Sequence, residues 1–216
     1  MSKFSKSWVS KESPSISTKI KETIRPPGPL KPRLDRAVKR IDVQIQRLGH
    51  ASERFVERDK SIFNRVVDAY MKHDEQRANI FASELAEIRK MEKMILHARL
   101  ALEQIVLRLK TVTELGDIAV TLTPVVGVIQ NIRGGMAAVS PQAEKELGEI
   151  GSLLSGIVMD AGQVAGTSLD FEMINEDSKN ILNEAAAVAE QRMKQRFPDL
   201  PSLVTQPTGE ESPSTI

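Results

Sequence analysis

The chain has 216 residues and no cysteine; 27% of its residues are charged and 4% are aromatic. This composition disfavours a compact β-rich core and excludes disulfides, thiolate metal sites and a cysteine nucleophile. The net charge of +1 conceals a division, because residues 1–110 hold 24 basic and 14 acidic residues whereas residues 111–216 hold 6 and 15. The basic half favours an anionic partner, for which the acidic half of the same chain would compete.

The first predicted element is a short basic and aromatic segment, residues 1–24. Phe4 and Trp8 lie four residues apart and would share one face of a helix. At a membrane surface, apolar burial adds to the attraction between lysines and anionic headgroups. We expect this segment to contact a membrane, and an unstructured tail with incidental aromatic residues is the alternative. The contacting residues would be Lys3, Phe4, Lys6, Trp8, Val9 and Lys11.

A proline-rich linker, residues 25–32, precedes a long heptad pattern. The linker is expected not to be helical, although Pro32 can occupy the first turn of the helix that follows. Over residues 33–115 apolar residues recur at alternating spacings of four and three, with a turn expected between Tyr70 and Gln76. Two helices joined by a short connection bury both seams only when they pack antiparallel, so a helical hairpin is predicted. Its seam contains Leu34, Ile41, Leu48, Phe55, Phe81, Ile88 and Ile95, with Ser52 and Asp59 as polar exceptions and either Met91 or Glu92 at one position.

A basic face is predicted on the first helix of the hairpin. Both lipid phosphates and nucleic acid would suit such a face. Nucleic acid is disfavoured, because no aromatic stacking residues are interleaved and no known binding module is present. An ordinary solvated helix face is the alternative interpretation. The basic residues are Arg33, Arg36, Lys39, Arg40 and Arg47.

Shorter helices are predicted over residues 117–165, after a break at Gly116. The first is disturbed by Pro124 and is expected to end at Gly134–Gly135. The second begins at Ser140, because serine caps a helix and the proline that follows fits its first turn.

The second of these helices is acidic, and its glycines lower helix propensity. We expect the segment 140–175 to fold over the basic hairpin and to be released from it readily. The hairpin and the short helices together form a predicted core, residues 33–175.

A last helix is predicted from Asn175 to Phe197, with Ile181, Ala185, Val188 and Met193 on one side, followed by a proline-containing tail. The region 176–216 thus combines a helix with a peptide ligand. Prolines restrict the backbone of the tail, so it can bind extended in an apolar groove at a low entropic cost. An overlapping helical pattern, EQRMKQRF, is the alternative, which Pro198 disfavours. We expect Phe197, Leu200 and Leu203 to be exposed in the free subunit.

No catalytic, metal or cofactor site is predicted. The three histidines, His50, His73 and His97, lack metal-ligand spacing. Phosphate-binding loops, dinucleotide fingerprints and nucleophile elbows are all missing from the sequence. We therefore expect a non-enzymatic protein without a small-molecule substrate.

The order of these elements resembles the layout of the ESCRT-III membrane-remodelling proteins. RPPGPLKPRLDRAVKRIDVQI is similar to the start of the hairpin in archaeal members of the Cdv cell-division type, and the resemblance covers about residues 25–201. It implies autoinhibited monomers that open, polymerise with themselves and with paralogues on anionic membranes, and constrict membrane necks. It also implies removal of subunits by a vacuolar-sorting-type AAA ATPase, whose microtubule-interacting-and-transport domain binds C-terminal motifs.

FPDLPSL resembles the proline-containing class of such motifs, with Phe197, Pro198, Leu200, Pro201 and Leu203 as the binding residues. A short paralogue without the C-terminal winged helix of some members is expected. We expect a cytoplasmic protein that is peripheral at the inner face of the cell membrane, at the division site. A membrane-stress coiled-coil protein of the phage-shock type and a coiled-coil adaptor without membrane activity are the alternatives.

Overall fold

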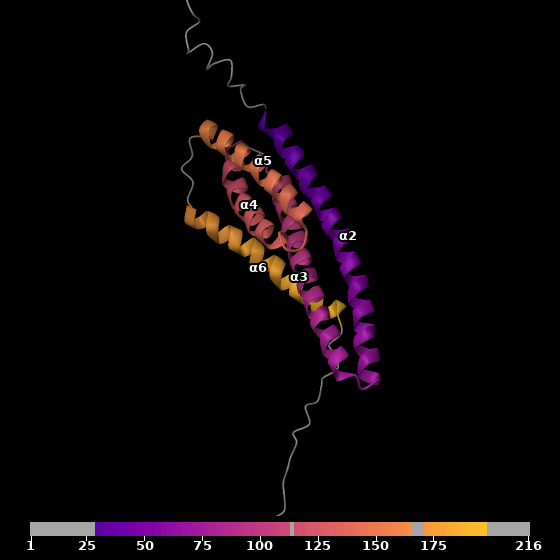
Figure 1. Cartoon of the computed structure of the whole chain (residues 1–216). Helices are drawn as coiled ribbons and strands as arrows, with labels where there is room; N and C mark the ends of the chain where they lie inside the picture. Colours follow the sequence, from indigo (N-terminus) through magenta and orange to yellow (C-terminus); the bar gives the residue numbers. More distant parts are fainter. Residues whose placement is uncertain (1–28, 113–114, 166–170, 198–216) are drawn as a thin grey trace, which may run out of the picture.

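The computed structural model describes residues 29–112, 115–165 and 171–197. Within these residues the chain forms helices and no strands, which confirms the all-α class. Figure 1 shows their arrangement. The helices are α2 (Leu30–Met71), α3 (Glu75–Thr111), α4 (Leu115–Met136), α5 (Pro141–Ala165) and α6 (Phe171–Arg196).

Helices α2 and α3 lie antiparallel along their length and are joined by a tight turn at Lys72–Asp74 (Figure 1). The 42 residues of α2 correspond to a length of about 63 Å. The turn needs a left-handed residue, which His73 supplies with a φ of 52°. Asp74 caps α3, because its Oδ1 accepts a hydrogen bond from the Arg77 N–H at 3.1 Å. The turn therefore lies between Tyr70 and Gln76, where the weakened heptad pattern predicted it.

The first turn of α2 corrects the prediction for the linker. The helix begins at Leu30, so Pro32 is already helical and the last residues of the supposed linker belong to the hairpin. Proline is tolerated there because the first N–H groups of a helix have no intrahelical partner. At the other end, α3 stops at Thr111, earlier than predicted, and Gly116 lies in the first turn of α4 rather than at the break.

Helices α4 and α5 form a second antiparallel pair against the open end of the hairpin, the end opposite its turn (Figure 1). Ser140 caps α5 as predicted, since its Oγ accepts a hydrogen bond from the Ala143 N–H at 3.3 Å. The predicted end of α4 was wrong, because this helix continues through Gly134–Gly135 to Met136. Pro124 lies inside α4, and its carbonyl oxygen accepts a hydrogen bond from Ser178 Oγ of α6 at 2.9 Å.

Helix α6 crosses α3 and α4, and its last turn reaches the middle of the hairpin (Figure 1). Ile181, Ala185 and Ala189 are buried at a constant spacing of four. The prediction for Val188 was wrong, because this side chain is 37% exposed and Ala189 takes the inward position. Small alanines bring α6 close to the surface that it covers.

Two apolar cores of unequal size result. The larger one joins the open-end half of the hairpin to α4, α5 and α6. The smaller one, around Ile62, Val66, Leu85 and Ile88, lies between α2 and α3 alone near the tip. The tip half of the hairpin is therefore only two helices thick, as Figure 1 shows.

Candidate functional site

Three arginines on one side of α2 contact the acidic helix α5. Arg33, Arg40 and Arg47 are separated by seven residues each, a spacing that keeps them on the same side of a helix. Each forms an ion pair across the α2–α5 interface. Their partners are Asp160 for Arg33, Glu149 and Glu146 for Arg40, and Glu146 for Arg47.

Glu146 lies between two of these arginines. Its Oε2 is 3.3 Å from Arg40 Nη2, and its Oε1 is 3.1 Å from Arg47 Nη1. The hydrogen bonds from Arg47 and Arg40 lower the pKa of Glu146 below its ordinary value. The hydrogen bond to Glu149 is the main cause of a raised pKa for Arg40. Both sides of the interface thus favour their charged forms.

A glycine of α5 makes room for the first of these arginines. A Cβ added to Gly156 would lie 3.1 Å from Arg33 Nη2, closer than ordinary contacts allow. The sequence predicted only a lower helix propensity from these glycines and did not predict this role. The signal that could have revealed the interface is the spacing of Glu146, Glu149, Gly156 and Asp160, which places all four on one side of α5.

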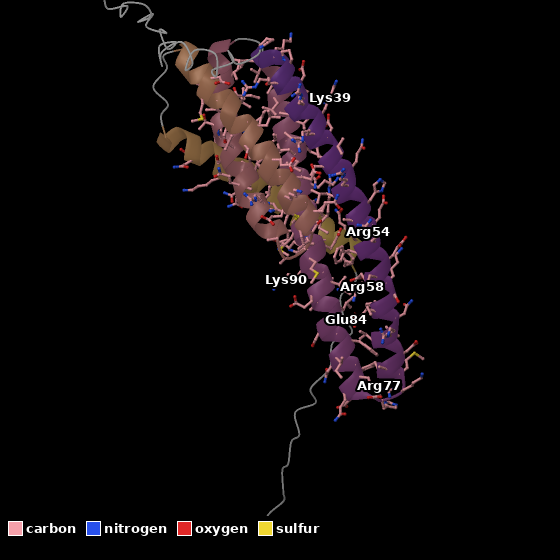
Figure 2. All side chains as sticks on the ribbon, turned by 45° about the horizontal axis from the view of Figure 1, so that its top comes forward. Lys39, Arg54, Arg58, Arg77, Glu84 and Lys90 are labelled. Carbon is pink, nitrogen blue, oxygen red and sulfur yellow. The ribbon has the colours of Figure 1, made fainter. Side chains whose placement is uncertain are left out.

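The predicted basic face is therefore divided. Arg33, Arg40 and Arg47 lie against α5, whereas Arg36 and Lys39 are exposed on α2, and no described residue forms an ion pair with either of them. Figure 2 labels Lys39 near the open end of α2. The structure thus separates arginines that are neutralised in this conformation from cations that stay open to solvent.

A second polar contact lies where α6 ends. Ser52 of α2 donates a hydrogen bond to Glu92 Oε1 of α3 at 2.6 Å, inside the hairpin seam. Arg196 of α6 approaches both, with its Nη1 3.2 Å from Ser52 Oγ and 3.2 Å from Glu92 Oε1. Burial raises the pKa of Glu92, against the opposing effects of the Ser52 and Arg196 hydrogen bonds.

Phe197 lies beside this contact, and its predicted exposure was wrong. The residue is 8% exposed, and the Arg89 guanidinium carbon lies 5.3 Å from the centre of its ring. Arg89 in turn donates to the buried carboxylate of Asp59, with 2.7 Å between Nε and Oδ1. The ring of Phe197 packs against the hairpin because, in an isolated subunit, it would otherwise be exposed to water.

Other predicted site residues occupy the hairpin seam or fall outside the described residues. Leu34, Ile41, Leu48, Ile88 and Ile95 are buried in the hairpin, and Phe55 and Phe81 are half-buried beside them. The membrane-contacting residues Lys3, Phe4, Lys6, Trp8, Val9 and Lys11 lie outside the described residues, as do Pro198, Leu200, Pro201 and Leu203 of the tail motif.

The described residues contain no group of three or more His, Asp or Glu side chains that could hold a metal ion. His50 contacts Glu53 on its own helix, and His97 Nε2 lies 3.1 Å from the Leu182 carbonyl oxygen. Among the helices described here, none combines the length and the apolar character needed to cross a bilayer.

The chain is similar in sequence to known cell division proteins. It is 47% identical over 174 residues to Cell division protein B1 of Sulfolobus acidocaldarius, a match that covers 81% of each chain. It is 31% identical over 175 residues to Cell division protein B of the same organism, covering 79% of this chain and 67% of that protein. No protein-family model and no solved structure matches the chain.

Proposed function

The chain belongs to the cell division protein B family, the archaeal ESCRT-III proteins, and from this premise we propose that it is a polymer subunit that remodels membranes during cell division. Subunits assemble on the membrane, constrict a neck and are removed by a vacuolar-sorting-type AAA ATPase. The role is structural, as it is in proteins of this type, and involves no catalysis by the chain itself. Self-assembly and co-assembly with paralogues supply the polymer.

The ion pairs between carboxylates of α5 and arginines of α2 are the observation that supports this proposal. In the conformation described above, three arginines of the basic helix are neutralised by carboxylates of the same chain. An anionic membrane would present negatively charged groups that can pair with the same arginines. The conformation is therefore a closed one, in which the acidic helix occupies a surface that the membrane would otherwise bind.

Opening would join the two parts of the divided basic face. Release of α5 exposes Arg33, Arg40 and Arg47 next to Arg36 and Lys39, so that one side of α2 becomes continuously basic. Each basic residue near an anionic membrane contributes about 1 kcal/mol, so three added arginines strengthen binding by about a hundredfold. The N-terminal lysines and aromatic residues add to this attraction.

The proposal is tested by neutralising α5 without touching the basic helix. In the full chain, Glu146→Gln, Glu149→Gln and Asp160→Asn are combined, and co-sedimentation with anionic vesicles is measured together with negative-stain microscopy. We expect stronger binding and more filaments than with the wild type. The matched control combines Glu53→Gln, Glu57→Gln and Glu87→Gln, which adds the same charge on exposed residues of the hairpin.

The two variants separate the possible outcomes. Equal increases in vesicle binding by both variants would show that net charge alone causes the effect, and would contradict the closed interface. If neither variant binds vesicles at any protein concentration, the result would favour a coiled-coil adaptor without membrane activity. Vesicles without anionic lipid serve as the baseline, since the added attraction is electrostatic.

A further inference from the structure

A small cavity lies between the middle of α2 and the beginning of α5. Its walls come from residues 44–54 of α2 and from Ser140, Gln142 and Ala143. Its volume is about 270 Å³, whereas one water molecule needs roughly 10–15 Å³, so a polyatomic ion fits together with some of its waters. The polar groups on its walls decide which kind of ion that is.

Gln44 is a buried amide without a hydrogen-bond partner. The residue is 2% exposed and lines the cavity, and no described residue donates to its side chain or accepts from it. Buried polar groups are nearly always hydrogen-bonded, because an unpaired one loses its hydration without compensation. Among the described residues, the side-chain atom that is both sealed from solvent and unpaired is Glu92 Oε2, so the Gln44 amide opens into the cavity. It is therefore available to a ligand there.

The N-terminus of α5 faces the same cavity. The first N–H groups of a helix have no intrahelical partner and carry a partial positive charge. The Ala143 N–H donates to Ser140 Oγ, whereas no group within the described ranges accepts from the Gln142 N–H. The start of this 25-residue helix thus adds a backbone donor and a positive potential to the amide of Gln44.

Cations of α2 lie around the opening of the cavity. Arg54, which Figure 2 labels on α2, is exposed and forms no ion pair with any residue that the structure describes. Arg47 pairs with Glu146 through Nη1 at 3.1 Å, and a guanidinium has five N–H groups, so others remain for a second acceptor. His50 also lines the cavity, with its Nδ1 3.3 Å from Glu53 Oε2. The site is therefore rich in donors and positively charged.

We propose that this cavity binds a phosphate group, which bridges α2 and α5. A phosphate group offers three or four acceptor oxygens, enough for an amide, a guanidinium and a backbone N–H that come from two helices. Helix N-termini are common positions for phosphate, because the free N–H groups and the dipole both favour an anion. The group belongs either to free phosphate or to a lipid headgroup. The site does not depend on the proposed function, because soluble phosphate would bind without a membrane.

Phosphate binding would stabilise the closed conformation, because the donors lie on both sides of the α2–α5 interface. A ligand that binds only the closed form lowers the open fraction by a factor of one plus the ratio of its concentration to its Kd. At ten times Kd, the open fraction falls about tenfold. Chloride should act in the opposite direction, because salt screens the ion pairs between the two helices.

Inorganic phosphate is the probe, and amide hydrogen exchange of residues 142–150 in the full chain is the readout. Near saturation, phosphate should slow exchange about tenfold, whereas chloride at equal ionic strength should not slow it. Gln44→Leu and Arg54→Gln should each raise the phosphate concentration required about tenfold or more. Gln44→Leu replaces an unpaired buried amide by an apolar side chain, so we expect the variant to fold, which circular dichroism checks.

The matched controls are Gln46→Leu and Arg36→Gln, which make the same changes at exposed residues of α2 outside the cavity. Both should respond to phosphate like the wild type. Equal protection of the wild type, Gln44→Leu and Arg54→Gln would overturn the site, since the phosphate effect would then come from elsewhere.

Vesicles distinguish the two sources of the phosphate group. Phosphatidylcholine vesicles that contain phosphatidic acid present a phosphate monoester at a surface. Protection by inorganic phosphate that is lost in Gln44→Leu and Arg54→Gln supports a site for free phosphate. Protection by these vesicles alone, lost in the same two variants and kept in their controls, supports a site for a lipid headgroup. If neither probe slows exchange in the wild type, the proposal is wrong.

Discussion

Reversing the charge of Arg40 is the sharpest test of the closed conformation. Arg40 is the central arginine of the α2–α5 interface and contacts Glu149 and Glu146. The Arg40→Glu substitution removes both attractions and places a third carboxylate beside the other two. We expect α5 to detach from α2 while the hairpin itself stays folded, because Arg40 takes no part in its apolar seam.

The expected loss in stability of the closed conformation depends on how exposed the ion-paired side chains are. The Arg40 side chain is 33% exposed, and those of Glu146 and Glu149 are 31% and 50% exposed, so solvent screens the interaction strongly. Partly exposed pairs contribute about 0.2–1 kcal/mol each, and the new repulsion is of similar size. The closed conformation should lose about 1–3 kcal/mol, which shifts the ratio of closed to open subunits by about 5- to 150-fold.

Hydrogen exchange of the α5 amides over residues 150–161 is the assay, measured on the full chain at low and high salt. Exchange in Arg40→Glu should be faster than in the wild type, and the difference should shrink at high salt. Arg36→Glu carries the same charge change on the exposed side of α2 and should leave α5 protected. Glu149→Arg, added to Arg40→Glu, should restore part of the protection through a reversed pair.

Equal exchange of the α5 amides in Arg40→Glu and Arg36→Glu would contradict the closed α2–α5 interface. Failure of Glu149→Arg to restore protection to Arg40→Glu would also contradict it, because the two side chains would then not be coupled. A loss of hairpin helicity in Arg40→Glu, measured by circular dichroism, would show that the substitution acts on folding rather than on opening.

Further predictions concern the seam and the glycines. Asp59→Asn weakens the buried bond to the arginine of α3, and thermal unfolding should show a loss of about 1–3 kcal/mol. The raised pKa of Glu92 stabilises the closed fold at low pH, so the free energy of unfolding should fall as pH rises above about 4.5, and Glu92→Gln, followed in denaturant titrations, should lack this decline. Gly127→Leu should loosen α6, because even a Cβ would lie 3.1 Å from Ser178 Oγ, and increased exchange in α6 would report it. Gly135→Ala meets no neighbouring atom and should stabilise the protein by about 0.5–1 kcal/mol in thermal unfolding.

Local features of the helices were predictable because they depend on neighbouring residues. The start of α5 is an example, since a serine cap and a proline in the first turn act within four residues. The turn before α3 is another, because a weakened heptad pattern marks where pairing of the two helices stops. The end of α4 was not predictable in this way: Gly134 and Gly135 favour a stop locally, yet the helix continues to the buried Met136.

The candidate site was predictable only in part. The basic residues of α2 were visible in the sequence, but their division into a covered and an open side depends on which helix packs against α2. The same limit applied to Phe197, which a local pattern places at the start of an exposed tail. In the structure its ring lies against Arg89, which is 108 residues away in the chain.

Helical structure, the division of charge between the two halves of the chain and the polar interruptions of an apolar seam were all predictable from the order of the residues. Helix periodicity and capping act over a few residues and leave a local trace. The covering of three α2 arginines by acidic α5, and the packing of Arg196 and Phe197 at the interruptions of the seam, depend instead on how the helices pack together. Those contacts join segments about 100 to 144 residues apart, and their partners are selected by the packing of whole helices.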